Sequence, residues 1–252
     1  MLRVGGRSTR SRVELVFCRS DSCGFISVRK LLVFPGMHGS KVLLEDFKQH
    51  APDSFDVQLL ELPESIFDYP SLAEHFRQTV IGAGPCVVMG ESFSGPLSVL
   101  LASQCENVEA LVMAASFVTP PSPWIAKFLP WRLLMSIPPS KEFVARFLLE
   151  IDRKQQLVET VYNEIRSRPV RAMAGRMRVV TRVDVREALA RVTCPVLYLR
   201  AKNDWLVPKR CLDRVRDVCG SVEVVELSAP HLILQREPEA CWNAISELCG
   251  RG

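Results

Sequence analysis

The stretch CVVMGESFSGPLSVLLA (residues 86–102) contains a serine placed as a nucleophile would be. An apolar run leads into it, and Gly90 and Ser94 stand two residues before and two after Ser92. A strand that reverses directly into a helix strains the residue at the apex and leaves room only for small residues at those two positions. Ser94 is a poorer apex because Pro96 follows it by two. The spacing therefore indicates Ser92 as a nucleophile, and the alternative is a serine that merely caps a helix.

A serine hydroxyl is a weak nucleophile until a base takes its proton, so a histidine is required. The chain has four histidines, which are His38, His50, His75 and His231. Where a nucleophilic serine sits on such a strand-to-helix turn, the base comes late in the chain, on a loop after the last strand. Only His231 follows Ser92, and it lies a few residues past an apolar run, in SAPHLILQREP. His231 is therefore the predicted base.

A carboxylate is needed to orient the imidazole, and it is expected at the end of an earlier strand. Asp204 stands just beyond an apolar run in LYLRAKNDWLVP. Asp213 and Asp217 fall in the next predicted helix, where we expect surface charges. The predicted order is thus Ser92, Asp204, His231. Each of the three also has an ordinary explanation, as a helix cap, a loop aspartate and a half-buried histidine.

Acyl transfer also needs N–H groups that bind the developing oxyanion. The residue after the nucleophile, Phe93, supplies one, and the second normally comes from the turn after an earlier strand. That turn is FPGMHGS (residues 34–40), in which Met37 is the candidate donor, although a glycine turn without a role is the alternative. His38 lies in the same turn and could touch the substrate. We assign it no catalytic part, because such a residue more often faces solvent.

Regular patterns elsewhere predict the elements that position these residues. Apolar runs and alternations predict strands at 31–34, 55–62, 86–89, 108–115, 196–201 and 222–227. Helices are predicted at 42–49, at 71–81 with a capping box from Ser71 to Glu74, after Ser92, at 209–218 and at 238–248. Strands that alternate with helices predict an α/β fold with a mostly parallel sheet covered by helices on both faces. In such sheets, ligands bind beyond the carboxyl ends of the strands.

With these residues in place, the chain resembles the α/β-hydrolase superfamily. It is most similar to small bacterial-type esterases and to plant acyltransferase relatives with a PGMDGTG-like turn and a GESFSGP elbow. The resemblance covers roughly residues 31–248 and rests on Pro35-Gly36-Met37, Gly90 to Pro96, Asp204 with Val207-Pro208, and Pro230-His231 followed by Leu234-Gln235. It implies the α/β-hydrolase fold.

The resemblance also implies roles for individual residues. Ser92 would be the nucleophile, Asp204 the acid, His231 the base, and Met37 and Phe93 the oxyanion donors. The sequence has His38-Gly39-Ser40 where relatives carry an aspartate, a glycine and a threonine, which bears on substrate detail. The usual first hairpin of the family is not evident in the sequence.

The strand rhythm disappears in the middle of the chain after Pro120-Pro121-Ser122-Pro123. By resemblance, residues 119–192 form a helical cap inserted between two core segments, 28–118 and 193–252. The aromatic residues Trp124, Phe128 and Trp131 lie in this segment and, with His38, are candidate substrate-pocket residues. The alternatives are packing of the cap onto the core, a wall for an acyl chain, and a patch that touches a membrane or lipid.

Six arginines gather later in the same segment, namely Arg171, Arg176, Arg178, Arg182, Arg186 and Arg191. Arg178, Arg182 and Arg186 have the four-residue spacing of one helical face. This set is interpreted as a solvated basic face, and the alternative is docking of an anionic acyl donor such as an acyl-carrier protein.

Composition excludes several classes of protein. A chain of 252 residues with 48% apolar and 24% charged residues is globular, neither fibrous nor disordered. The net charge of +4 is too small to indicate a general nucleic-acid binder. No apolar run reaches the ~18 residues of a transmembrane helix. Nine cysteines without a CxxC pair are expected as free thiols in a reduced compartment. Residues 1–27 are expected to be a basic, loosely ordered extension with an edge strand at 13–17.

The sequence therefore predicts a cytoplasmic serine hydrolase that cleaves an ester or thioester of a small-molecule or lipid-like acyl group. No metal or cofactor is implied. One alternative is an acyltransferase that passes the acyl group to an alcohol. The other, from a different class, is a non-catalytic scaffold that uses the hydrolase fold for binding.

Overall fold

The structure, a computed structural model, describes residues 28–151 and 155–250. The predicted basic extension at 1–27, with the edge strand expected at 13–17, lies outside the described residues. None of the helices in the described part of the chain is both long and apolar enough to cross a bilayer.

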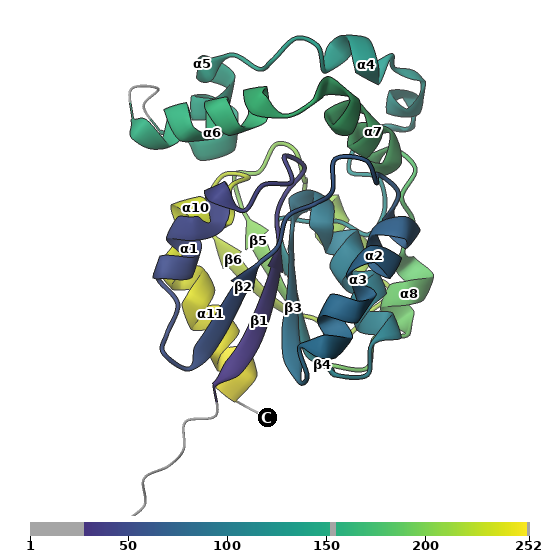
Figure 1. Cartoon of the computed structure of the whole chain (residues 1–252), viewed down its shortest axis with the longest axis vertical. Coiled ribbons are helices and arrows are strands. Elements are labelled where there is room, and N and C mark those ends of the chain that lie inside the picture. The colour runs from purple at the N-terminus through teal and green to yellow at the C-terminus, as the bar shows by residue number, and fades with distance from the viewer. Residues whose placement is uncertain (1–27, 152–154, 251–252) are drawn as a thin grey trace, which may run out of the picture.

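Six parallel strands form one sheet at the centre of the molecule (Figure 1). They are β1 (Arg29–Phe34), β2 (Phe55–Leu59), β3 (Cys86–Glu91), β4 (Val108–Ala114), β5 (Val196–Ala201) and β6 (Glu223–Leu227). The strand order is β2-β1-β3-β4-β5-β6, so the order reverses between β1 and β3. Ligands bind beside such a reversal, outside the carboxyl ends of the strands. The turn after β1 and the turn after β3 are the two segments that the sequence singled out.

Helices cover both faces of the sheet, which confirms the predicted fold class. Figure 1 shows α2 (Tyr69–Gly82), α3 (Gly95–Gln104) and α8 (Arg186–Ala190) on one side, and α1 (Glu45–Gln49), α10 (Ile233–Arg236) and α11 (Pro238–Gly250) on the other. Helix α9 (Arg210–Arg216) packs with the first group. Because side chains alternate along a strand, Leu32 packs in one apolar core and Leu31 in the other. Both faces being buried explains why these strands read as continuous apolar runs.

Two predicted helices begin differently in the structure. The segment expected as one helix at 42–49 is a 3₁₀ helix, η1 (Val42–Leu44), followed by α1. Helix α2 begins at Tyr69, before the capping box predicted at Ser71, and that prediction was wrong. The cap is Asp68, whose carboxylate accepts a 2.8 Å hydrogen bond from the Ser71 N–H. Asp68 could take this role because Pro70, in the first turn, has no N–H to satisfy.

A helical insertion lies between β4 and β5. It contains η3 (Trp124–Phe128), α4 (Trp131–Leu134), α5 (Lys141–Phe143), the π-helix η4 (Val144–Leu149), α6 (Gln156–Ser167) and α7 (Val170–Val180). In Figure 1, α4 to α7 lie across the carboxyl ends of the strands. A separate apolar cluster joins Leu148 and Val158 of the insertion to Leu43 and Leu232 of the core. The helices therefore stand over the edge of the sheet where ligands would bind.

The arginines of the insertion do not share one helical face, so that expectation was wrong. Helix α7 ends at Val180, which leaves Arg182 in a turn and Arg186 at the start of α8. Arg186 pairs with Asp184 at 2.6 Å, and Arg178 is exposed on α7. Arg176 is buried rather than solvated. The four-residue spacing failed as a guide because the helix ends within the set.

Candidate active site

Ser92 occupies a strained turn between β3 and α3. Its φ is 49°, in the left-handed region that non-glycine residues rarely adopt, and the 3₁₀ helix η2 (Ser92–Ser94) carries the chain into α3. A Cβ atom on Gly90 would lie 2.3 Å from the carbonyl oxygen of Ser94, so the turn closes only with glycine there. The hydroxyl of Ser94 is occupied, because it donates to the carbonyl of Pro35. Ser92 is thus the serine at the apex.

The structure brings Ser92, His231 and Asp204 together, each on the segment that follows a different strand. Ser92 Oγ lies 2.9 Å from His231 Nε2, and His231 Nδ1 lies 2.7 Å from Asp204 Oδ2. The other carboxylate oxygen, Oδ1, accepts hydrogen bonds from the N–H groups of Leu206 at 2.8 Å and Val207 at 2.9 Å. The loop after β5 therefore fixes the carboxylate with one oxygen turned toward the imidazole.

The charge state of His231 follows from these neighbours. A carboxylate only accepts hydrogen bonds, so Nδ1 carries the proton and Nε2 of the neutral ring accepts from the Ser92 hydroxyl. Burial by itself lowers the pKa of His231. The charge of Asp204, its hydrogen bond and the charge of Glu91 outweigh burial, so the pKa is raised above its ordinary value. The ring is therefore a better proton acceptor than an isolated histidine.

Glu91, the last residue of β3, belongs to this site and was missed by the sequence analysis. Its side chain is fully buried, and Oε2 accepts a 3.3 Å hydrogen bond from the N–H of Gly36. Burial raises the pKa of this carboxyl, while the charge of His231 and the Gly36 N–H oppose the rise. A carboxylate at the end of an otherwise apolar strand was the signal that could have found it.

The two predicted oxyanion donors, Met37 and Phe93, lie at matching places in the turns that follow the neighbouring strands β1 and β3. Phe34 of β1 pairs with Gly90 of β3, and Met37 and Phe93 each follow three residues later. Side chains tie the two turns together, through the Ser94 hydroxyl and the Glu91 carboxylate already described. Tyr69 holds the backbone of Phe93 by donating a 3.0 Å hydrogen bond to its carbonyl.

His38 is buried, so the expectation that it faces solvent was wrong. Its Nδ1 accepts a 3.1 Å hydrogen bond from the N–H of Ser40. Burial, together with the charges of Arg176 and Arg168, lowers the pKa of His38 to about 3. The ring is neutral with its proton on Nε2, and that buried nitrogen has no partner among the described residues. The sequence did not show this burial, because Arg176 and Arg168, whose charges act on His38, lie more than a hundred residues later in the chain.

The three aromatic pocket candidates take two different places. Trp131 is 8% exposed, donates a 3.1 Å hydrogen bond to the carbonyl of Ala126 and packs with Ala174 of α7. Trp124 and Phe128 are 73% and 69% exposed and lie at the surface of the insertion. Trp131 therefore packs the insertion internally, while the other two face outward.

Neither a reactive thiol nor a metal site is evident among the described residues. The seven described cysteines are all unpaired, and burial raises the pKa of Cys86, Cys194 and Cys211 to about 11. Such thiols remain protonated near neutral pH. Within residues 28–151 and 155–250, no group of three or more His, Cys, Asp or Glu side chains is placed to hold a metal ion.

Comparisons with known proteins identify the fold and the family. No curated protein matches the sequence. Similar solved structures include a hydrolase from Pseudomonas aeruginosa PA01, with a TM-score of 0.77, 17% identity and coverage of 88% of this chain and 90% of that one. An esterase from Exiguobacterium antarcticum has a TM-score of 0.76, 13% identity and coverage of 88% and 92%. An enol-lactonase from Burkholderia xenovorans LB400 has a TM-score of 0.74, 12% identity and coverage of 88% and 92%. At these identities the likeness shows the fold.

The family itself is shown by a sequence match. The family described as Serine aminopeptidase, S33 matches residues 59–229, a span that includes Ser92 and Asp204 and ends two residues before His231. This span exceeds half of the chain, and the parallel sheet with its helical layers agrees with it. The protein is therefore a hydrolase that belongs to this family of α/β hydrolases.

Proposed function

We propose that the protein is a serine hydrolase that cleaves a carboxylic ester or thioester through an acyl-enzyme on Ser92. The observation that carries the proposal is the continuous chain from Ser92 Oγ to His231 Nε2 at 2.9 Å and from His231 Nδ1 to Asp204 at 2.7 Å. The positive φ of Ser92 adds to it, because backbone strain of this kind presents a nucleophile at the top of a sheet.

The first half of the reaction forms the acyl-enzyme. His231 Nε2 takes the hydroxyl proton as Ser92 Oγ attacks the carbonyl carbon, and the carbonyl electrons move to oxygen. The N–H groups of Met37 and Phe93 stabilise this oxyanion. When the oxyanion collapses, the bond to the leaving oxygen or sulfur breaks, and the imidazolium gives its proton to the leaving group. Asp204 stabilises the imidazolium throughout and keeps its own charge.

The second half releases the acid. His231, neutral again, takes a proton from water as the water oxygen attacks the acyl carbon. The second oxyanion collapses, the bond from the acyl carbon to Ser92 Oγ breaks, and the imidazolium returns the proton to Ser92. The raised pKa of His231 favours proton uptake in both attacks.

The substrate is proposed to be a small-molecule or lipid-like acyl compound. We also propose that residues 119–192 act as the cap over the site, since α4 to α7 cross the carboxyl ends of the strands, while α8 at the end of this range packs against a face of the sheet. The names of two structural neighbours, an esterase and an enol-lactonase, point in the same direction. The unpaired described cysteines support a reducing, cytoplasmic location.

A panel of substrates tests this function. The full chain is assayed on ester and thioester series of increasing acyl length, with an amino-acid amide alongside, since the family is named for a peptidase. Ser92→Ala is the inactive variant and Ser103→Ala the control, because the Ser103 hydroxyl donates only to the carbonyl of Leu100 in α3. We expect turnover of esters or thioesters that Ser92→Ala loses and Ser103→Ala keeps.

Two further measurements separate the rivals. An alcohol is added to the reaction, and a product ester in excess of the free acid would identify an acyltransferase instead. A fluorophosphonate probe should modify Ser92, as located by mass spectrometry. A folded wild-type protein that neither reacts with the probe nor turns over any substrate would be a binding scaffold.

A further inference from the structure

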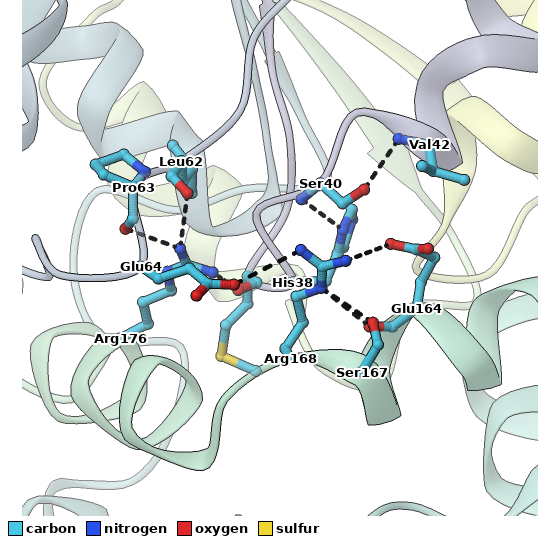
Figure 2. A network of polar contacts seen from close by, with 11 residues as sticks. His38, Ser40, Val42, Leu62, Pro63, Glu64, Glu164, Ser167, Arg168 and Arg176 are labelled. Atoms are coloured by element: carbon cyan, nitrogen blue, oxygen red, sulfur yellow. Dashed lines mark hydrogen bonds and ion pairs between the residues drawn. The ribbon is translucent and has the colours of Figure 1, made fainter.

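Arg176 joins the insertion to the core turn that carries Met37. It lies on α7, is 1% exposed, and its Nη1 donates a 2.7 Å hydrogen bond to the carbonyl of Met37. Its Nη2 donates to the carbonyls of Leu62 at 3.3 Å and Pro63 at 3.2 Å (Figure 2). One side chain therefore holds the turn after β1 and the loop after β2 in fixed relation to α7.

Gly39 shows how closely the guanidinium approaches the turn. Its φ is +79°, and a Cβ atom there would lie 2.5 Å from Arg176 Nη1. Glycine is therefore required at this position for two reasons, the positive φ of the backbone and the close approach of the arginine. The turn and the arginine fit each other as a unit.

Arg176 is a buried charged side chain whose hydrogen bonds all go to backbone carbonyls, which a residue that only fills space would not provide. The guanidinium donates to three neutral carbonyl oxygens, and burial lowers its pKa to about 10, with Glu64 opposing. It stays charged at neutral pH, and a buried charge is costly unless its hydrogen bonds are well made. An apolar side chain could pack there without that cost, but it could not hold the three carbonyls.

We propose that Arg176 is a positioning residue for the oxyanion donor Met37. The hydrogen bond to the Met37 carbonyl fixes the peptide that follows Met37, and this restrains the residue whose N–H points at the reacting oxygen. Donors must be preorganised to stabilise a transition state, so the bond acts on catalysis from the insertion. This inference rests on the proposed function, because it requires Met37 to act as an oxyanion donor.

The test compares variants of two arginines on the same helix. Arg176→Met removes the donors, Arg176→Lys keeps the charge with fewer donors, and the exposed Arg178→Gln is the matched control. Steady-state constants are measured per active site titrated with fluorophosphonate, and affinity is measured for a trifluoromethyl ketone, which forms a tetrahedral oxyanion on the serine. Loss of one oxyanion donor lowers kcat roughly 10²- to 10³-fold, and Arg176→Met should approach that range.

The pattern of effects distinguishes positioning from simple stabilisation. We expect kcat and ketone affinity of Arg176→Met to fall together with little change in KM, Arg176→Lys to recover part of both, and Arg178→Gln to match the wild type. If Arg176→Met does not fold, Arg176→Lys and Gly39→Ala, which displaces the guanidinium, must show the same paired loss. Unchanged kcat and ketone affinity per active site, whatever the melting temperature, would overturn the inference. A wild type that fails to react with fluorophosphonate would instead remove the proposed function, and this inference with it.

A second, independent feature is an apolar surface on the insertion, here called the cap apolar surface. It consists of the exposed large apolar residues Trp124, Ile125, Phe128, Leu129, Leu133, Leu134 and Ile137. Trp131 anchors the segment by its buried ring and its hydrogen bond to the carbonyl of Ala126. The neighbouring apolar side chains are thus exposed beside a packed residue, and α4 lies at the end of the molecule opposite the C-terminus in Figure 1.

The charged residues within the segment that carries this surface are all basic. No aspartate or glutamate occurs from residue 110 to residue 141, whereas Lys127, Arg132 and Lys141 do, and of these Lys141 is paired with Glu159 at 2.5 Å. The Lys127 Nζ lies 5.8 Å from the ring centre of Trp124 and 5.0 Å from that of Phe128. Tryptophan beside lysine is the combination that suits the level of lipid headgroups, and basic residues add attraction to anionic lipids.

The geometry points to an anionic lipid bilayer as the partner of the cap apolar surface. In a two-fold dimer centred on this surface, Lys127 and Arg132 would approach the basic residues of the second copy, and like charges repel. A bilayer takes up the apolar side chains and pairs the basic ones with its headgroups. The surface would thereby hold the insertion at a membrane without a spanning helix.

Vesicle binding tests the partner directly. The full chain is sedimented with vesicles of phosphatidylcholine alone or with added phosphatidylserine. Trp124→Ser with Phe128→Ser should reduce binding to both, and Lys127→Glu with Arg132→Glu should reduce binding to the anionic vesicles only. Ile81→Ser, at an exposed apolar residue of α2, should leave binding unchanged. Absence of vesicle binding, equal binding by all variants, or a dimer that the Trp124 and Phe128 changes dissociate would overturn the inference.

Discussion

The hydroxyl of Ser116 donates a 2.6 Å hydrogen bond to the carbonyl oxygen of Ser92. Ser116 lies just after β4, and its own carbonyl accepts a hydrogen bond from the hydroxyl of Tyr198 in β5. Side chains thus link the turn after β3, the segment after β4 and the middle of β5. The strained turn at Ser92 depends on this support, because a positive φ persists only where surrounding contacts determine it.

Gly95→Ala should damage that support. A Cβ atom at this position would lie 1.7 Å from the Ser116 hydroxyl oxygen, inside the first turn of α3. The buried surroundings leave little room for a shift, so we expect the free energy of unfolding to fall by about 2 kcal/mol or more. Denaturant titration measures the change. Gly82→Ala is the control, because nothing lies within 4 Å of its added Cβ, and a stability equal in the two variants would contradict the prediction.

Asp204→Asn should lower kcat by about 10⁴-fold with the fold intact. Asparagine retains an oxygen for the N–H groups of Leu206 and Val207, but its amide nitrogen would face His231 Nδ1 and favour the wrong tautomer. Steady-state kinetics and circular dichroism together check this outcome. Asp213→Asn, at an exposed position of α9, should behave as the wild type, and a similar loss there would point to a general effect of charge.

The pH dependence of kcat/KM should show an acidic limb whose midpoint lies above pH ~6.5, the ordinary pKa of histidine. His231 acts only when neutral, and Asp204 and Glu91 raise its pKa against the opposing effect of burial. Activity therefore rises as pH increases through this raised value. His38 should add nothing to the limb, because its pKa is about 3. A limb centred below pH 6 would contradict the assignment.

Glu91→Gln should move the same acidic limb to lower pH. The substitution removes a negative charge that raises the pKa of His231. His231 should therefore stay neutral, and the enzyme active, to a lower pH in the variant than in the wild type. Glutamine keeps an oxygen that can accept from the Gly36 N–H, which should preserve the turn. Paired pH profiles on one substrate measure the shift, with Glu74→Gln on the exposed face of α2 as the control. A limb that stays in place would show that Glu91 has no electrostatic role.

Local patterns failed where the deciding contact is distant along the chain. The start of α2 was misplaced because Asp68 and Ser71 compete for one cap, and only the path of the chain into the helix selects between them. The arginine spacing suggested one exposed face, yet Arg176 is buried against carbonyls more than a hundred residues away. Glu91 was given no role from the sequence, since its partner Gly36 lies 55 residues earlier.

The sequence by itself determined the parallel sheet, the turn at Ser92 and the succession of Ser92, Asp204 and His231 along the chain. These follow from nearest-neighbour chemistry, namely apolar runs, small residues beside a strained apex, and loops after strands. Only the tertiary structure decided which side chains the two turns share, why His38 is neutral and how Arg176 reaches Met37. Burial and electrostatic interaction depend on what packs around a group in space, and a linear pattern does not contain that information.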